Sequence, residues 1–257
     1  MKILYKEKKS LLDNKLIATF LLITGVFGIL LIIHHIASYE AILRPNMEYL
    51  ITNKVITNDR CGSIFLLFFT NQSNILVDLY FILFAFGIFG NKKLYNLTHN
   101  EAVRGAVTLY IVITGIIYCS VLMPFAPSFF PFPNIGKMWF SNVVNTWNHM
   151  FIPLLSIILW FIPVSYKPIK NRKATLYYLI YPAVYFVFSI INGAVINFYP
   201  YPFLSSKLLW DYIFKNKPYN PQTGIFVLAV VFVILCALFY AIGILLNAIH
   251  NKVVKNK

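Results

Sequence analysis

Polar side chains interrupt an apolar segment in the stretch "FFTNQSNILVD", residues 68–78. Thr70, Asn74 and Asp78 follow one another at intervals of four residues, so on a helix they share one face, and Asn71 borders that face. A threonine hydroxyl becomes a nucleophile when a base lies beside it, and a carboxylate inside an apolar segment is a functional candidate. We therefore take Thr70 as a candidate nucleophile, and Asn71, Asn74 and Asp78 as candidate pocket residues.

A second polar stripe supplies the base that such a nucleophile needs. In "SNVVNTWNH", residues 141–149, Asn142, Asn145 and His149 lie at positions i, i+3 and i+7, with Asn148 beside them. A neutral imidazole takes the proton of a hydroxyl and returns it to a leaving group, and amide side chains donate hydrogen bonds to a developing oxyanion. The pattern predicts His149 as a general base.

Further polar residues occur at a comparable depth in other apolar segments. Tyr185, Ser189 and Asn192 form a third polar stripe. His34 and His35 lie at the C-terminal end of the first apolar segment. Because an unpaired polar group in hydrocarbon costs several kcal/mol, these groups must face one another or enclose water. We predict a polar chamber whose substrate-binding residues are Asn71, Asn74, Asp78, Asn145, Asn148 and Asn192. In the alternative interpretation the Asn and Ser side chains hold helices together, and His34 and His35 cap a helix end at the membrane interface.

The elements that must position these residues are membrane-spanning helices. The 257-residue chain is 59% hydrophobic and 12% charged, whereas soluble domains carry about 25% charged residues. Long unbroken apolar runs favour helices over barrel strands, which alternate over about 10 residues. The sequence predicts one all-α domain, a polytopic bundle of six transmembrane helices near 16–36, 62–89, 102–122, 143–163, 175–197 and 224–247.

Lys and Arg in the connecting segments indicate the orientation of the spans. They gather in alternate segments: Lys2, Lys6, Lys8, Lys9 and Lys15; Lys92, Lys93 and Arg104; Lys167, Lys170, Arg172 and Lys173; Lys252, Lys255 and Lys257. Both termini are therefore predicted to be cytoplasmic. On this topology Thr70 lies about 12 Å, Asp78 about 24 Å and His149 about 9 Å below the outer boundary.

The net charge of +14 does not indicate a nucleic-acid partner, because the basic residues lie in short segments between apolar runs. Proline-rich and aromatic segments at 123–140 and 197–210 are predicted to lie at the outer interface, where they either form a simple aromatic belt or roof a pocket. Cys61 and Cys119 are placed near one membrane face, where a disulfide between them is one option, and Cys236 is read as a packing residue.

Several other chemistries lack their motifs. Five scattered histidines do not supply the clusters of a di-iron site, and the three cysteines have no metal-binding spacing, so we expect neither a metal nor a cofactor. The sequence contains no GxSxG, GxxxxGK[ST] or GxGxxG element, which disfavours rhomboid-type proteolysis and nucleotide chemistry.

Four segments resemble the androgen-induced-protein family: "FFTNQSN" (68–74), "RGAVTLYIVITGIIY" (104–118), "NTWNH" with "FIP" (145–153) and "YPYPFL" (199–204). That family consists of six-span membrane proteins, and its animal members resemble threonine hydrolases of fatty acid esters of hydroxy fatty acids. The resemblance implies Thr70 and His149 as the catalytic pair, with Asn145 opening the N-x-x-x-H spacing. Thr146 stands where the family carries a further histidine.

These observations favour an intramembrane hydrolase with Thr70 as nucleophile and His149 as base, acting on a lipid or acyl ester in the outer half of the bilayer. The alternative is a non-enzymatic transporter or lipid-binding protein in which Asp78 couples to protons or cations. Abundant Lys, Asn, Ile, Phe and Tyr with scarce Arg indicate an AT-rich genome, so we expect a bacterial plasma membrane. Membrane lipids are the expected partners, and the sequence carries no signal for an oligomeric state.

Overall fold

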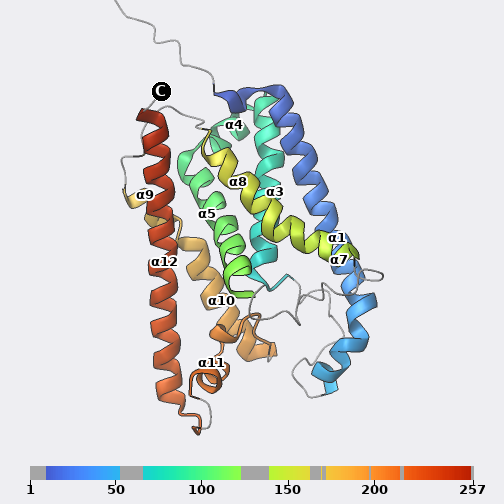
Figure 1. Ribbon diagram of the computed structural model, residues 1–257, viewed down its shortest axis with the longest axis vertical. Helices are drawn as coiled ribbons and strands as arrows, with labels where there is room; N and C mark the ends of the chain where they lie inside the picture. The colour runs from blue at the N-terminus through green and yellow to red at the C-terminus, as the bar shows by residue number, and fades with distance from the viewer. Residues whose placement is uncertain are drawn as a thin grey trace, which may run out of the picture.

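The computed structural model describes residues 10–52, 66–122, 139–162, 169, 172–196, 198–214 and 217–255, and all of its regular elements within these ranges are helical (Figure 1). The prediction of an all-α bundle is confirmed. In chain order the elements are η1 (Leu11–Asp13), α1 (Lys15–Thr52), α3 (Phe69–Ile88), α4 (Lys92–Thr98), α5 (Glu101–Ile117), η2 (Tyr118–Leu122), α7 (Trp139–Thr146), η4 (Trp147–Phe151), α8 (Ile152–Trp160), α9 (Arg172–Tyr177), α10 (Ile180–Ile196), η5 (Pro202–Leu204), α11 (Ser206–Ile213) and α12 (Pro221–Lys255).

Six helical segments among the described residues are long and apolar enough to cross a membrane, which indicates a membrane protein as predicted. They cover 15–37, 69–88, 101–120, 143–160, 175–196 and 221–255. Helices α1 and α12 extend beyond the predicted spans, because hydropathy marks the apolar stretch rather than the whole helix. At α12 the extension follows from Pro221, which suits the first helical position, and from Asn220, whose side chain accepts the Thr223 N–H at 3.1 Å.

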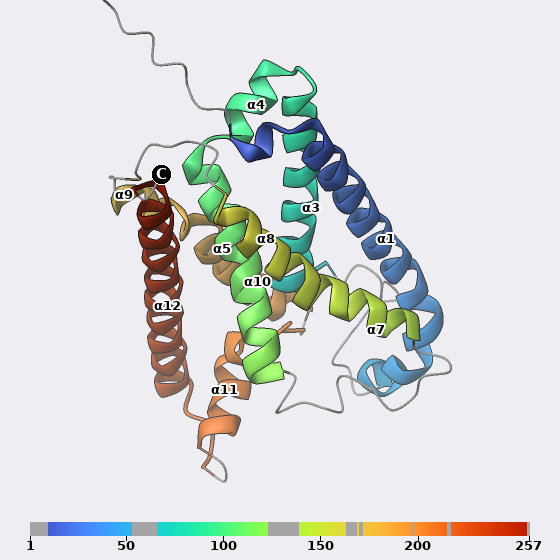
Figure 2. The same cartoon turned by 45° about the horizontal axis from the view of Figure 1, so that its top comes forward.

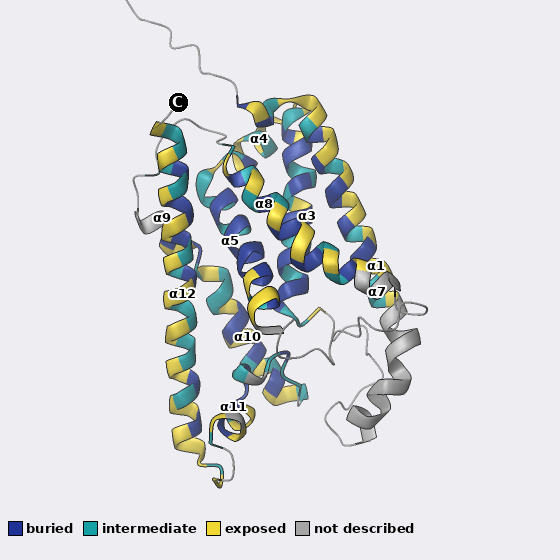
Figure 3. Cartoon of the chain, in the orientation of Figure 1, coloured by how far each residue is buried: buried dark blue, intermediate teal, exposed yellow. Residues whose placement is uncertain are grey.

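Helix α5 lies in the interior of the bundle, and α1 and α12 stand on opposite sides of it (Figures 1 and 2). Leu109, Ile111 and Ile113 of α5 are completely or almost completely buried. By contrast, α10 and α12 leave many large apolar side chains exposed, including Val195, Phe226 and Val233 (Figure 3). Exposed apolar surface of this extent fits contact with lipid tails.

Helices α1 and α3 pack closely through two glycines of α1. A methyl group at Gly25 would lie 2.5 Å from the backbone oxygen of Asp78, and one at Gly28 would lie 2.3 Å from the Asp78 carboxylate. Small residues let helix backbones approach in this way. Gly25 also faces Phe81 and Ile82, whereas Gly28 faces Asp78, so the two helices run in opposite directions.

A continuous segment made of α7, η4 and α8 crosses α3 obliquely, with α7 beside α1 and α8 beside α5 (Figures 1 and 2). Its centre, η4, is a π-helical turn, and Pro153 follows it as the second residue of α8. Proline cannot donate to the carbonyl four residues earlier, which here belongs to His149, so a local widening of the helix is the expected response. Pro153 thus accounts for the π turn that precedes α8.

Arg104 ties α5 to the end of α8 on the side of the bundle where the C-terminus lies. Its guanidinium donates to the carbonyl oxygens of Leu159 and Ile162 and lies 4.9 Å from the ring centre of Trp160. Carbonyl groups at a helix C-terminus have no partner within the helix and attract cations. Arg104 therefore acts as a buried cap of α8.

Candidate functional site

Thr70 lies in the first turn of α3, because the helix begins at Phe69 and not near Gly62 as predicted. Residues 66–68 form a turn before it, and 62–65 lie outside the described residues. Because an apolar turn and an apolar helix have the same hydropathy, a prediction from hydropathy includes residues 66–68 in the helix. Thr70 is accordingly at the helix start rather than about 12 Å along it, and Asp78 lies about 12 Å further along the axis.

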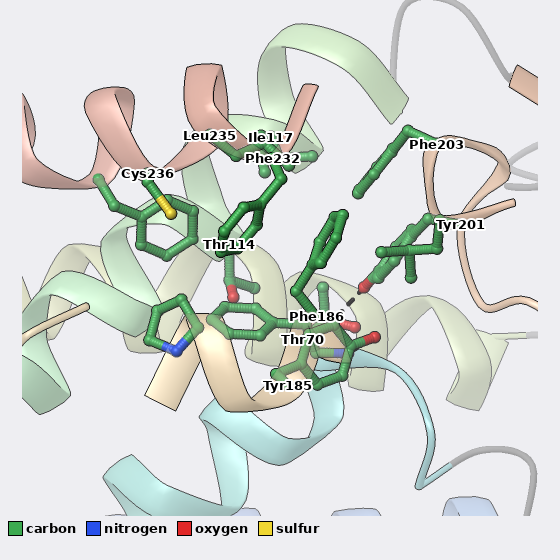
Figure 4. Close-up of a pocket in the computed structure, with 14 residues that line it drawn as sticks. Thr70, Thr114, Ile117, Tyr185, Phe186, Tyr201, Phe203, Phe232, Leu235 and Cys236 are labelled. Carbon is green, nitrogen blue, oxygen red and sulfur yellow. Dashed lines mark hydrogen bonds between the residues drawn. The ribbon is translucent and has the colours of Figure 1, made fainter. Parts of the chain in front are cut away.

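Two tyrosine hydroxyls cap the start of α3. Several helix starts follow the usual pattern, as at Asn100, whose side chain accepts the Ala102 N–H at 2.9 Å. The residue before α3 is Phe68, which has no capping side chain. Instead the Phe69 N–H donates to the Tyr185 hydroxyl at 3.1 Å, and the Thr70 N–H donates to the Tyr201 hydroxyl at 3.4 Å (Figure 4).

The two phenols are themselves held in place. The Tyr185 hydroxyl donates to the carbonyl of Leu67 at 2.9 Å, and Tyr201 also hydrogen-bonds to the Thr70 side chain. Burial raises the pKa of Tyr201 to about 12, so its phenol remains protonated at neutral pH. Two donors on the backbone of α3 and two neutral phenols thus surround the Thr70 hydroxyl.

An aromatic cavity of about 60 Å³ adjoins Thr70. Elements α3, α5, α10, η5 and α12 enclose it, and Figure 4 shows Thr70, Tyr185 and Tyr201 together at one end with Cys236 further along the cavity. The lining residues are Phe69, Thr70, Thr114, Ile117, Pro182, Tyr185, Phe186, Tyr201, Phe203, Leu204, Phe232, Leu235, Cys236 and Phe239. Apolar walls with a few polar groups at one end are typical of small-molecule sites, but the volume of this cavity is well below the about 300–1,000 Å³ of such sites.

His149 lies in η4 with its ring stacked on that of Tyr118 at a centroid distance of 4.3 Å. Its Nδ1 lies 3.0 Å from the backbone oxygen of Asn145. A carbonyl only accepts hydrogen bonds, so Nδ1 carries the proton and the lone pair of the neutral ring is on Nε2. His35 of α1 lies close enough to His149 for a positive charge on one ring to affect the other.

Thr70 and His149 lie on different sides of one contact between α3 and α5. Ser73 and Thr114 are joined by a hydrogen bond of 2.8 Å between their hydroxyls, and Ser73 also donates to the Thr70 carbonyl. Next to Thr114, a methyl group at Gly115 would lie 3.3 Å from the His149 carbonyl oxygen. The structure thus places Thr70 and His149 near neighbouring residues of α5, Thr114 and Gly115, but His149 is not among the residues that line the aromatic cavity.

The predicted pocket residues divide into two groups. Asn74, Asp78 and Asn148 are buried, and the side-chain oxygens of all three lack a hydrogen-bond partner among the described residues. Asn145 and Asn192 are half-buried, and neither lines the aromatic cavity. Asn71 is buried in the first turn of α3.

Most of the residues around the aromatic cavity were not predicted as site residues. Tyr185 belongs to one of the predicted polar stripes, whereas Tyr201 and the phenylalanines belong to none. A signal existed in α12, where Phe232, Leu235, Cys236 and Phe239 repeat at helical spacing. That spacing is equally typical of core packing, so only the structure identifies a cavity there.

Two predictions concern residues outside the described ranges. Cys61 is one of these residues, so the disulfide to Cys119 stays a prediction, while Cys119 itself is exposed. Most of the outer segment 123–140 also lies outside them. Within 197–210, η5 and the start of α11 are described, and Tyr201 and Phe203 border the aromatic cavity as a roof would.

Comparisons of the chain with models of protein families, with curated proteins and with solved structures found no match. The candidate function therefore depends on the chemistry of the residues described above. Among the described residues, no three His, Cys, Asp or Glu side chains gather as a group that would hold a metal ion.

Proposed function

We propose that the protein is an intramembrane hydrolase that cleaves a lipid or acyl ester in the outer half of a bacterial plasma membrane, with both termini in the cytoplasm. Thr70 is the nucleophile and His149 the general base. The observation that carries the proposal is the position of the Thr70 hydroxyl at the edge of an aromatic cavity, beside backbone N–H groups at a helix start. The resemblance to threonine hydrolases agrees with it.

The tautomer of His149 supports its role as base. Because Nδ1 is committed to the Asn145 carbonyl, Nε2 holds the lone pair that accepts a proton. Stacking on Tyr118 fixes the plane of the ring. A base held by a second hydrogen bond and by packing is the arrangement that activates hydroxyl nucleophiles.

In the proposed reaction, His149 Nε2 takes the proton of the Thr70 hydroxyl as Oγ1 bonds to the ester carbonyl carbon. The tetrahedral intermediate then expels the alcohol, which receives the proton from His149, and an acyl-threonine remains. Water then loses a proton to His149 and attacks the carbonyl carbon of this ester; the bond to Thr70 Oγ1 breaks, His149 returns the proton to Oγ1, and the carboxylic acid leaves. For this to occur a rotation of the Thr70 side chain away from Tyr201 is required, since the two are hydrogen-bonded at rest.

The start of α3 provides the electrostatic support for this step. At rest the Thr70 N–H donates a hydrogen bond to the Tyr201 hydroxyl. Once the substrate carbonyl takes the place of that hydroxyl, the N–H is positioned to donate to the oxyanion. One such donor is typically worth about 3 kcal/mol in the transition state. The apolar walls of the cavity suit the hydrocarbon part of a lipid substrate.

Ester turnover in proteoliposomes tests the proposal. Purified full-length protein, reconstituted with a fluorogenic long-chain acyl ester, is expected to hydrolyse it, and Thr70→Ala or His149→Ala should lower kcat by at least about 100-fold. Thr108→Ala is the matched control, because Thr108 is also a buried threonine of the bundle but does not line the aromatic cavity. Equal turnover by wild type and Thr70→Ala would refute the assignment.

A further inference from the structure

We propose that Asn74, Asp78 and Asn148 form a binding site for one sodium ion between α1, α3 and η4. This site is separate from the aromatic cavity and goes beyond the proposed hydrolysis. Asn74 and Asp78 are fully buried, and Asn148 is 2% exposed. Four side-chain oxygens, one from each asparagine and two from Asp78, have no hydrogen-bond partner among the described residues.

Two contacts place η4 at the level of Asp78 along α1. The ring of Trp147 lies 4.8 Å from the ring of Phe27 in an edge-on contact. The next residue of α1, Gly28, faces the Asp78 carboxylate. Consecutive residues of α1 therefore contact η4 and the carboxylate, so η4 and Asp78 meet at the same height in the bundle.

The direction of the Asn148 side chain follows from its neighbours. Trp147 packs on α1, whereas His149 stacks on Tyr118 at the end of α5. Asn148 comes between them in the chain and is buried, so it points between α1 and α5. Helix α3 occupies that position, because it contacts α1, α5 and η4. Asn148 thus faces α3.

The corresponding face of α3 carries Asn74 and Asp78. Ser73 points to α5 through its hydrogen bond to Thr114, and Asp78 points to α1 through its contact with Gly28. At about 100° per residue, Asn74 lies on the face between these two directions. The Asn74 amide nitrogen donates to the Thr70 carbonyl at 2.8 Å, which leaves its oxygen available to a ligand. The four oxygens accordingly converge where α1, α3 and η4 meet.

The chemistry of these oxygens identifies the ligand. Four buried hydrogen-bond acceptors without a partner among the described residues are a costly combination. Hard cations bind carboxylate and amide oxygens, and one carboxylate balances one positive charge. A proton on Asp78 would satisfy one pair of oxygens, whereas a monovalent cation contacts all four.

Thermal unfolding of the detergent-solubilised full-length protein tests the site. A ligand that binds the folded state raises Tm with its concentration. Replacing N-methyl-D-glucamine chloride by NaCl at constant ionic strength and pH should raise the Tm by at least about 2 °C. The rise should saturate, and KCl should give a smaller effect. An unchanged Tm in the wild-type protein would overturn the proposal without any variant.

Variants assign the effect to these residues. Asp78→Asn should abolish the sodium-dependent rise in Tm, and Asn148→Leu should shift it to at least about 10-fold higher NaCl. Asp211→Asn, which changes an exposed carboxylate, is the matched control and should keep the full response. A sodium response retained in Asp78→Asn, or a Tm that depends on pH but not on sodium, would overturn the proposal. Ester turnover of Thr70→Ala is independent of this result, so the two proposals fail separately.

Discussion

Arg104 and Asp78 are both buried charged residues of the helical bundle, yet their surroundings differ. Arg104 donates to the Leu159 and Ile162 carbonyls and lies over Trp160, so its charge serves to join α5 to α8. Asp78 lies against Gly28, and neither of its oxygens has a hydrogen-bond partner among the described residues. Two carbonyl oxygens and a ring hold Arg104, and its Nη1 makes only an ion pair of 3.8 Å with Glu101, whereas no described residue donates to either Asp78 oxygen, which indicates a ligand.

The same contrast separates the two ends of the molecule. Near Arg104, the side chain of Trp160 donates to the Leu246 carbonyl at 2.8 Å, and Asn247 donates to Thr175 at 2.9 Å. These bonds join α8 and α9 to α12. Near Thr70, hydrogen bonds instead hold side chains at the edge of a cavity. We therefore expect substitutions at the first end to reduce stability and substitutions at the second to alter binding and reactivity.

The largest effect on stability is expected for Arg104→Ala. The substitution leaves two helix-terminal carbonyls without a donor, so the free energy of unfolding should fall by about 3 kcal/mol or more. Arg104→Lys keeps the charge but lacks the planar guanidinium group that donates to two carbonyls. Its free energy of unfolding should fall by less than that of Arg104→Ala. Unfolding in mixed detergent micelles measures both values. A loss below about 1 kcal/mol in Arg104→Ala would show that this end does not depend on the buried cap.

Gly28→Ala should have the next largest effect. Its methyl group would meet the Asp78 carboxylate at 2.3 Å, so α1 and α3 must separate. We expect a loss of about 1–3 kcal/mol in the free energy of unfolding and a weaker response to sodium. Leu30→Ala, at an exposed position of α1, is the control and should change stability far less. Equal losses in the two variants would argue against a close α1–α3 contact.

A smaller effect is expected for Tyr201→Phe. Loss of the phenol removes the acceptor of the Thr70 N–H and should cost about 1 kcal/mol of stability. At the same time it leaves that N–H open to a ligand, so Thr70 should react several-fold faster with a fluorophosphonate probe. Mass spectrometry of the labelled peptide gives the rate. Slower labelling would mean that Tyr201 assists Thr70 instead of competing with the ligand.

The smallest effect concerns pH at the end that contains Arg104. His99 lies 3.2 Å from the Asp13 carboxylate, but burial outweighs that carboxylate and lowers the pKa of His99 below its usual 6.5. The folded state therefore favours the neutral ring, and the unfolded state binds more protons. The contribution of His99 to the free energy of unfolding is therefore fully present above pH 6.5 and is lost as the pH falls below 6.5. His99→Gln should slightly flatten the dependence of the Tm on pH between pH 7 and 5.

Much of the bundle follows from the sequence, because six apolar runs of sufficient length leave little choice of fold. The polar stripes also led to Asp78 and Asn148. What the sequence did not provide is the start of α3, since Leu66, Leu67 and Phe68 are apolar both in a turn and in a helix. It also did not show that Tyr201, 131 residues from Thr70, would cap that helix, because such a contact depends on tertiary packing. The aromatic cavity likewise depends on tertiary packing, so the sequence did not show it.

The central claim is that Thr70 is a nucleophile activated by His149. Trapping of the covalent adduct tests it most directly: reconstituted full-length protein is treated with an alkyl fluorophosphonate, and the modified residue is located by mass spectrometry. We predict a phosphonyl group on Thr70 that is absent in Thr70→Ala and at least about 100-fold slower to form in His149→Ala. An adduct on another residue, or none in a protein that hydrolyses esters, would contradict the claim.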